Sequence, residues 1–195
     1  MMNTYAKAET LTGVIFAPLD WMRSVALVIA FSLLTALAAQ VLIPLPPVPI
    51  TGQTFAVLLT GALLGSRLGA LAMIAYLIEG ASGLPFFHAG HAGVQHLFGP
   101  TAGYLWAFPA AAFVTGYLAE RGWDKRFVTA AAAMALGSLV ILLCGWAWLS
   151  LFISPGAALH EGVLKFLVGD VVKIALAAAA LPSGWALIKR RRGLR

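Results

Sequence analysis

The stretch VLKFLVGDVVKIALAAAALPSGWALI, residues 163–188, decides the fold class. It is longer than the roughly 20 apolar residues that cross a bilayer as a helix. A basic tail follows it directly, beginning at Lys189 and ending at Arg195. Basic clusters beside a membrane helix usually fix its orientation and contact anionic lipid. The stretch therefore predicts a transmembrane helix whose C-terminal end lies at the cytoplasmic surface.

The composition extends this reading to the whole chain. Hydrophobic residues make up 61% of the 195 residues and charged residues only 10%, whereas a soluble domain carries roughly 25% charged residues. We therefore expect a single integral membrane domain over residues 1–195. The net charge of +6 does not indicate nucleic-acid binding, because five of the thirteen basic residues lie in the last seven positions.

Six apolar segments predict the helices of this domain. They cover roughly 25–43, 54–66, 68–79, 101–119, 127–153 and 163–188. The second and third are short and could form one helix interrupted at 65–67, so the pattern alone allows five helices or six. With six helices and a cytoplasmic N-terminus, eleven of the thirteen basic residues fall on the cytoplasmic side: Lys7, Arg23, Arg67, Arg121, Lys125, Arg126 and the five cations of the tail. The positive-inside rule thus favours an all-α bundle of six transmembrane helices with both termini cytoplasmic.

Two uncharged outer loops also stand out. The first, PLPPVPITGQT at 44–54, is proline-rich and cannot be helical. The second, at 80–100, is rich in glycine and aromatic residues, and we expect it to fold back onto the bundle as a lid. His88, His91 and His96 lie in this second loop, but their spacing is loose and no cysteine accompanies them. We therefore expect no metal site there.

Asp170 and Lys173 are the most informative residues, because they are charges inside the last apolar segment. They lie three residues apart and so share a helix face. Each charge near the centre of a membrane helix costs about 2.5–3.5 kcal/mol on insertion scales. The pair is expected in the outer half of the membrane and predicts a ligand site, although a buried ion pair that only ties helices together is the alternative.

Three further polar residues are candidates for the same site. Gln53 and Thr51 could offer amide and hydroxyl groups to a ligand, or could simply satisfy backbone groups of their loop. Glu79 ends the third segment and is either a pocket residue or an interfacial charge. The chain lacks a phosphate-binding G-x-x-x-x-G-K-[ST] motif and the common nucleophile and zinc-protease motifs, so we expect no enzyme.

Four stretches together resemble a known family. They are PLPPVPITGQTFAVLLTGALLG at 44–65, YLIEGASGLPFF at 76–87, LFGPTAGYLWAF at 97–108 and GDVVK at 169–173. In order and spacing they are similar to the BioY family, the substrate-binding S-components of biotin transporters of the energy-coupling-factor (ECF) type. His88 and Ala89 depart from the small residue and glycine common in the family's middle loop.

The resemblance implies the six-helix S-component fold and high-affinity binding of biotin near the outer surface, beneath the two loops. Asp170 and Lys173 take the family's ligand-binding positions, and the other implied biotin-binding residues are Thr51, Gln53, Glu79, Phe87 and Tyr104. It also implies a multi-pass protein of the inner (plasma) membrane that needs no cofactor. The implied partners are a membrane coupling protein and two cytoplasmic ATPases.

Ala26 and Ala30 form a small-residue step in the cytoplasmic half of the first segment, and the resemblance implies that it docks on the coupling protein. Ordinary packing within the bundle is the alternative. Three alternatives to biotin capture also stay open: an S-component for another vitamin, a self-sufficient carrier that uses Asp170 as a proton relay, and a small membrane enzyme.

Overall fold

The computed structural model describes residues 10–16 and 20–191, and this part of the chain is mainly helical. The α-helices are α1 (Leu11–Ile15), α2 (Trp21–Gln40), α3 (Gln53–Leu64), α4 (Ser66–Ala81), α5 (Ala102–Ala119), α6 (Phe127–Leu149), α7 (Pro155–Leu159) and α8 (Lys165–Arg191). Short 3-10 turns are η1 (His88–Gly90), η2 (Val94–Leu97) and η3 (Trp123–Lys125), and η4 (His160–Leu164) is a π-helical turn. The strands β1 (Leu42–Ile43) and β2 (Ile50–Thr51) form the one small sheet of the described residues.

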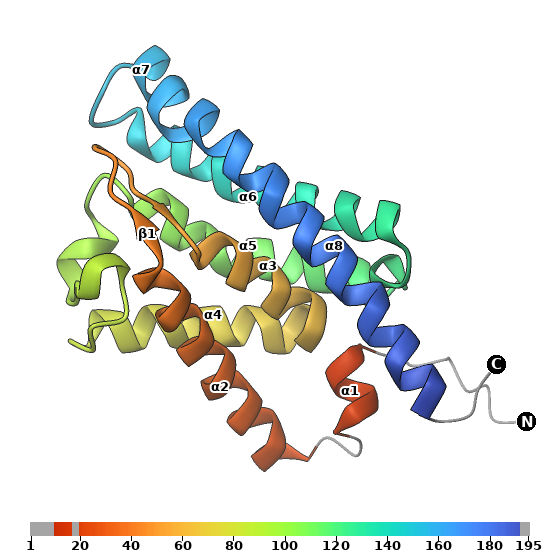
Figure 1. Ribbon diagram of the computed structural model, residues 1–195. Helices are drawn as coiled ribbons and strands as arrows, with labels where there is room; N and C mark the ends of the chain where they lie inside the picture. Colours follow the sequence, from red (N-terminus) through yellow and green to blue (C-terminus); the bar gives the residue numbers. More distant parts are fainter. Residues whose placement is uncertain (1–9, 17–19, 192–195) are drawn as a thin grey trace, which may run out of the picture.

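The predicted all-α class is confirmed, and each predicted apolar segment overlaps one of the helices α2 to α6 and α8. In the described ranges, α2, α5 and α6 are long and apolar enough to cross a membrane by length and composition. The β-hairpin, the turns η1 and η2, and α7 lie at one end of the molecule, and α1 lies at the other (Figure 1). We call these the hairpin end and the α1 end.

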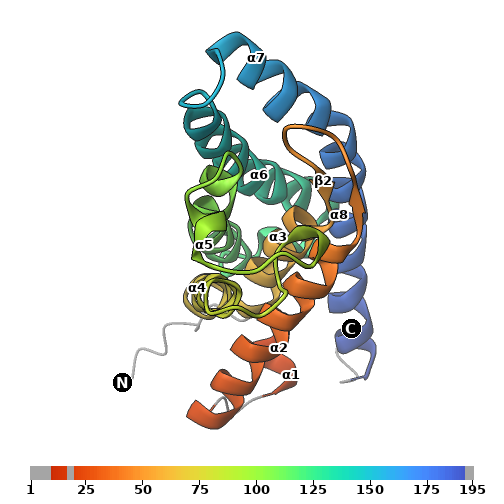
Figure 2. The same cartoon turned by 90° about the vertical axis from the view of Figure 1, so that its left-hand side faces the viewer.

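Helix α3 is the centre of the bundle, with α2, α4, α5, α6 and α8 around it (Figure 2). Nine of its twelve residues are buried. Small residues bring its backbone close to its neighbours: a Cβ added at Gly61 would lie 2.9 Å from the Cα of Ala112 in α5, and one added at Gly69 would lie 2.9 Å from the Cα of Gly61. Close approach of this kind is how helices associate in lipid, where hydrophobicity drives no contact.

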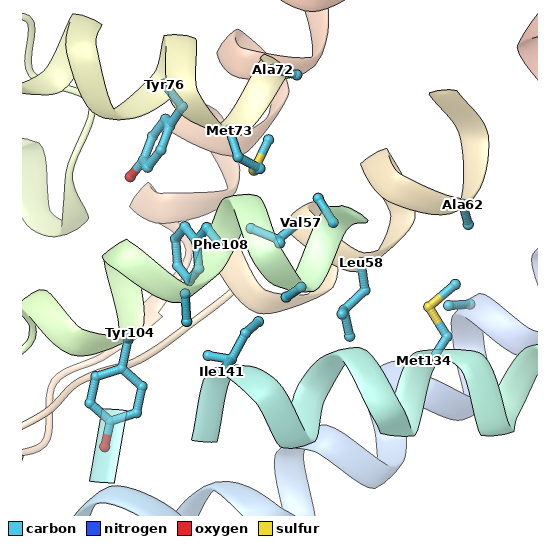
Figure 3. Close-up of a cluster of buried hydrophobic side chains, with 14 of the residues drawn as sticks. Val57, Leu58, Ala62, Ala72, Met73, Tyr76, Tyr104, Phe108, Met134 and Ile141 are labelled. Atoms are coloured by element: carbon cyan, nitrogen blue, oxygen red, sulfur yellow. The ribbon is translucent and has the colours of Figure 1, made fainter. Parts of the chain in front are cut away.

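The core around α3 includes aliphatic and aromatic side chains of α3, α4, α5 and α6 (Figure 3). Tyr76 of α4 and Phe108 of α5 face one another with ring centroids 6.3 Å apart. Val57 and Leu58 of α3 fill the space between α5 and α6. Tyr104 lies one turn along α5 from Phe108, toward the hairpin end, and begins the lining of the site described below.

Both ends of the first long helix differ from their predicted positions. The first long helix begins at Trp21 rather than at 25, because the carboxylate of Asp20 accepts the backbone N–H of Arg23 at 2.8 Å and caps it. It ends at Gln40 rather than at 43, since β1 follows.

The segment predicted over 127–153 ends at Leu149, and the last helical run begins at Pro155 rather than at 163. The side chain of Ser154 caps this run and proline occupies its first turn, which are strong helix-start features. The run then passes through η4 into α8.

The α1 end contains a contact that the sequence did not predict. Helix α1 docks on the bundle through Thr12, whose hydroxyl donates to the carbonyl of Leu63 at 2.6 Å. Its Leu11 side chain lies against Gly184 of α8. The predicted cytoplasmic position of the termini relies partly on Lys7, Arg192 and Arg195, which lie outside the described residues.

Candidate ligand site

A small cavity lies at the hairpin end, where five parts of the chain meet. Its lining comes from the hairpin, α3, η1, the start of α5 and α8, and consists of Val48, Pro49, Thr51, Gln53, Thr54, His88, Thr101, Tyr104, Leu105, Phe108 and Phe166. About 40 Å³ is open to the centres of water-sized molecules, and one such centre needs roughly 10–15 Å³. The cavity therefore holds a few waters as it stands, and a larger ligand requires movement of a covering segment.

The hairpin forms one wall of this cavity. Strands β1 and β2 pair antiparallel, with Leu42 opposite Thr51 and Ile43 opposite Ile50. Four prolines between residues 44 and 49 prevent helix formation. The hairpin returns the chain to α3 with Thr51 buried at the cavity.

Gln53 links the hairpin to the opposite loop through a continuous hydrogen-bonded chain. The Thr51 hydroxyl donates to Gln53 Oε1 at 2.8 Å, and Gln53 Nε2 donates to the Tyr76 hydroxyl at 2.6 Å. That hydroxyl donates in turn to the carbonyl of Phe86 at 3.1 Å. The amide of Gln53 is thus fixed at the cavity wall, and its predicted alternatives combine: it satisfies local groups and also lines the cavity.

Lys173 connects α8 to the hairpin. Its ammonium donates to the backbone carbonyl of Thr51 at 2.9 Å and to the hydroxyl of Thr54 at 2.8 Å. It also lies 3.5 Å from Asp170 Oδ1, as the three-residue spacing predicted. The ammonium of Lys173 is thus shared by a carboxylate, a carbonyl and a hydroxyl. Two of these partners belong to Thr51 and Thr54, which line the cavity, so a ligand in the cavity would lie near the ammonium.

Asp170 is almost fully buried, with 5% of its surface exposed. The Ser138 hydroxyl of α6 donates to its Oδ2. Its Oδ1 has no hydrogen-bond partner among the described residues beyond the ion pair with Lys173. A buried oxygen without a donor is costly, so Asp170 has one acceptor position available for a ligand N–H. Asp170 faces a shallow groove between α6 and α8, and it does not line the cavity itself.

Tyr104 is held in the cavity wall by the π-helical turn. Its hydroxyl donates to the carbonyl of Gly162 at 2.8 Å. The ring stacks on Phe166, with centroids 6.0 Å apart and planes at 20°. Turns of the π type often occur at functional sites, and this one aligns two aromatic rings that line the cavity.

Beyond Asp170 and Lys173, two more of the predicted site residues are absent from the cavity lining. Glu79 accepts a hydrogen bond from Ser32 of α2, which joins α4 to α2. Phe87 is fully buried and packs edge-on against Tyr76, with ring centroids 5.7 Å apart. The structure therefore brings Thr51, Gln53, Tyr104, Asp170 and Lys173 together at the cavity or beside it, and it does not bring Glu79 or Phe87 to the lining.

Among the residues of this site that sequence reasoning missed, Phe166, His88 and Ser138 are the most informative. Phe166 had a signal, since it lies four residues before Asp170 and so on the same helix face. His88 lines the cavity although its cluster was considered only for metal binding. Ser138 had no signal, because its partner lies 32 residues away. Among the described residues, no group of three or more histidine, cysteine or acidic side chains is placed to hold a metal ion.

Ala26 and Ala30, the predicted docking step, lie on an exposed face of α2. Their neighbours Val25 and Ile29 are also exposed, each at 45%. This face is consequently available to lipid or to another protein, and packing inside the bundle does not use it.

Comparisons with known proteins agree with this architecture. The BioY family model matches residues 4–190. A "Probable biotin transporter BioY" of Pyrococcus horikoshii is 43% identical over 80% of this chain and 91% of its own length. A "Biotin transporter BioY" of Thermotoga maritima is 38% identical over 76% of this chain and 87% of its own length.

A crystal structure of the S-component for biotin from an ECF-type ABC transporter has a similar fold, with a TM-score of 0.76. It is 24% identical, and the match covers 83% of this chain and 90% of that chain. This chain belongs to the BioY family.

Proposed function

We propose that this protein is the biotin-binding membrane subunit of an ECF-type transporter, and that it captures biotin from outside the cell with high affinity. The observation that carries the proposal is the Asp170–Lys173 pair, held at 3.5 Å beside the cavity of the hairpin end. The family match and the relatives named as biotin transporters support the choice of ligand.

The chemistry of the pair fits the ureido ring of biotin, which offers two N–H donors and one carbonyl acceptor. The free acceptor position of Asp170 suits an N–H group, and the ammonium of Lys173 can donate to an oxygen. We propose Thr51, Gln53 and Tyr104 as further contacts, since all three line the cavity. Glu79 and Phe87 would contribute from behind the wall, through Ser32 and Tyr76.

Calorimetry on the purified protein in detergent tests this function. We expect tight binding of biotin and no binding of thiamine or riboflavin. Absence of biotin heat, or equal binding of thiamine, would overturn the proposal in favour of another ligand. Biotin that stays bound through purification would support it.

We further propose a single domain over residues 1–195, with six transmembrane helices, both termini in the cytoplasm and the hairpin end outside, in the inner (plasma) membrane. The basic residues Arg121, Lys125 and Arg126 between α5 and α6 support this orientation. Indole groups near the hairpin end fit a membrane interface there: Trp106 donates to Leu97 O, Trp148 to Gly99 O and Trp146 to Pro155 O. Tryptophan is enriched at membrane interfaces. Reporter fusions at Arg195 test it, and an external C-terminus would refute the six-helix count.

The proposed partners are a membrane coupling protein and two cytoplasmic ATPases, which would drive release of biotin inside. The exposed face of α2 with Ala26 and Ala30 is the proposed docking surface. Replacing both by tryptophan should abolish energised uptake while biotin binding persists, because the cavity lies at the opposite end of the molecule from the start of α2 (Figure 1). Loss of binding as well would indicate misfolding, and retained uptake would exclude this surface.

Co-purification from membranes separates this function from the alternatives. ATPases that co-purify with the protein support the transporter subunit. A carrier that works alone should instead accumulate biotin in vesicles without ATP and should lose that activity in Asp170→Asn.

A further inference from the structure

Three of the chain's four histidines form a cluster on the loop that covers the cavity. The ring centroids of His88 and His91 are 5.1 Å apart, those of His91 and His96 are 4.9 Å apart, and those of His88 and His96 are 6.3 Å apart. His88 lines the cavity, whereas His91 is exposed. The cluster therefore reaches from the cavity wall to the surface.

The turn at residues 88–91, which carries His88 and His91, is held to α2 by polar contacts, whereas Phe87 and Leu97 on either side of it are buried. Gln40, at the end of α2, donates to the carbonyl of Phe87 at 3.1 Å and accepts the N–H of Gly90 at 2.9 Å. The turn between them closes on itself, as the N–H of Phe87 donates to the carbonyl of His91 at 3.0 Å. Ala89 has a φ of 55°, a conformation that non-glycine residues rarely adopt. The turn at 88–91 is mainly exposed, and exposed turns with few contacts are typical of segments that open locally while their buried flanks stay packed.

In residues 10–16 and 20–191, no carboxylate forms a salt bridge with the cluster. The elements packed against the loop are α2, α4 and α5. Their titratable groups toward this end are Glu79 and Tyr76 of α4 and Tyr104 of α5, which are engaged with Ser32, Gln53 and Gly162 respectively. The charges that act on His88 and His96 are those of other histidines.

We propose that this histidine cluster is a proton-operated latch on the cavity: neutral rings keep the loop closed over a bound ligand, and protonation of two or more rings drives the loop open. Like charges about 5 Å apart repel one another, and an open loop separates and hydrates them. The proposal rests on the proposed function, because the ligand it retains is the one proposed above.

The titration of the cluster has the required direction. Burial lowers the pKa of His88 below its usual value, and the charges of His91 and His96 lower it further. Burial and the charge of His91 lower the pKa of His96. A histidine whose pKa is lower in the closed loop than in the open loop stabilises the closed loop at high pH. Closure is then lost as the pH falls through the ordinary histidine range, since the open loop takes up the protons.

Release of bound biotin at pH 7.5 and pH 5.5 tests the latch. We expect the wild type to release biotin about tenfold faster at pH 5.5, because protonation places like charges about 5 Å apart in the closed loop. His91→Asn combined with His96→Asn should release biotin slowly at both pH values, as neither residue lines the cavity and asparagine keeps a hydrogen-bond donor. The control His160→Asn, outside the loop, should keep the wild-type pH dependence. A double variant that keeps the wild-type pH dependence would overturn the latch.

A second measurement needs no biotin and so separates failure of the latch from failure of the proposed function. A thiol placed in the cavity wall by Thr101→Cys, in a Cys144→Ala background, reports access to the cavity. At pH 5.5 a membrane-impermeant thiol reagent should label it several-fold faster with the native loop than with the His91→Asn and His96→Asn loop. Equal labelling at the same pH would overturn the latch, whatever ligand the cavity takes.

Discussion

Two buried aspartates lie near the two ends of helix α8: Asp170 is one of its own residues, and Asp124 belongs to η3. They differ in the groups that compensate the charge of the carboxylate. Toward the hairpin end, Asp170 lies 3.5 Å from the ammonium of Lys173, which also holds the hairpin through Thr51. Toward the α1 end, Asp124 of η3 is 1% exposed and accepts the indole N–H of Trp185 at 2.5 Å. In both carboxylates Oδ1 has no hydrogen-bond partner among the described residues.

The difference lies in how each carboxylate is compensated. Lys173 is a cation on a flexible type of side chain beside the cavity, so we propose that a ligand shares its donors and binds the free oxygen of Asp170. At Asp124 the nearest ammonium, that of Lys125, instead lies over the Trp185 ring, 4.7 Å from its centroid. The rigid indole of Trp185 donates to Asp124, and this hydrogen bond joins α8 to η3. Asp124 lines neither the cavity nor the groove beside Asp170. We therefore propose a ligand role for Asp170, whose partner is a cation beside the cavity, and a structural role for Asp124.

The largest expected effect is that of Lys173→Met. The change leaves the Asp170 carboxylate buried with Ser138 as its remaining partner, and an uncompensated buried charge costs about 3–5 kcal/mol. We expect a large fall in the thermal stability measured in detergent, together with loss of biotin binding. Adding Asp170→Asn to it should restore most of the stability without restoring binding. A single variant as stable as the wild type would contradict the coupling of the pair.

Asp170→Asn alone comes next. It keeps one acceptor and the shape of the side chain but removes the charge, so biotin affinity should fall by about 1.5–3 kcal/mol, the usual worth of a charge-assisted hydrogen bond. Calorimetry of biotin binding at several temperatures measures this loss of affinity. Unchanged affinity accompanied by loss of folding would instead assign the pair to helix packing, the alternative that the sequence left open.

Charge and hydropathy were sufficient to predict most of this architecture. A charge inside an apolar segment is so costly that Asp170 and Lys173 could be selected from the chain alone, and their spacing predicted the observed pair. The long helices were predicted because apolar length is a local property. The small capped features were not predicted: α1, the start at Pro155 and the π turn depend on single residues such as Ser154.

The rest of the site depends on contacts that are distant in sequence. Lys173 reaches Thr51 across 122 residues, and Tyr104 reaches Gly162 across 58. No spacing rule encodes such pairs. For the same reason the sequence could not show that Glu79 is engaged by Ser32, or that Asp124 in a short charged loop is as buried as a core residue.

Asp124→Ala sharpens the comparison from the α1 end. It removes the acceptor of the Trp185 N–H and leaves that donor buried, which should lower the free energy of unfolding by about 1–3 kcal/mol. Biotin affinity should stay unchanged, since Asp124 is remote from the cavity lining. Thermal unfolding and calorimetry on the same preparation measure both. A loss of affinity equal to that of Asp170→Asn would show that the two carboxylates do not differ in role.

The smallest expected effect is the pH dependence that Asp124 contributes to stability, and Asp124→Asn isolates it. Burial raises the pKa of Asp124 above its ordinary value, although the Trp185 N–H and Lys125 oppose that rise. The folded protein therefore binds this proton more tightly than the unfolded chain does. The stabilisation by this proton is fully present below the ordinary aspartate pKa and is lost as the pH rises through the raised pKa.

Asparagine keeps an acceptor for Trp185 and has no charge to bury. The stability of the Asp124→Asn variant relative to wild type should therefore increase with pH across this window, and the two proteins should differ by at most about 1 kcal/mol at neutral pH. Unfolding temperatures of the two proteins between pH 4 and pH 8 measure this difference. Curves that stay parallel would mean that Asp124 titrates alike in the folded and unfolded protein, and the contrast with Asp170 would then rest on the partner cation alone.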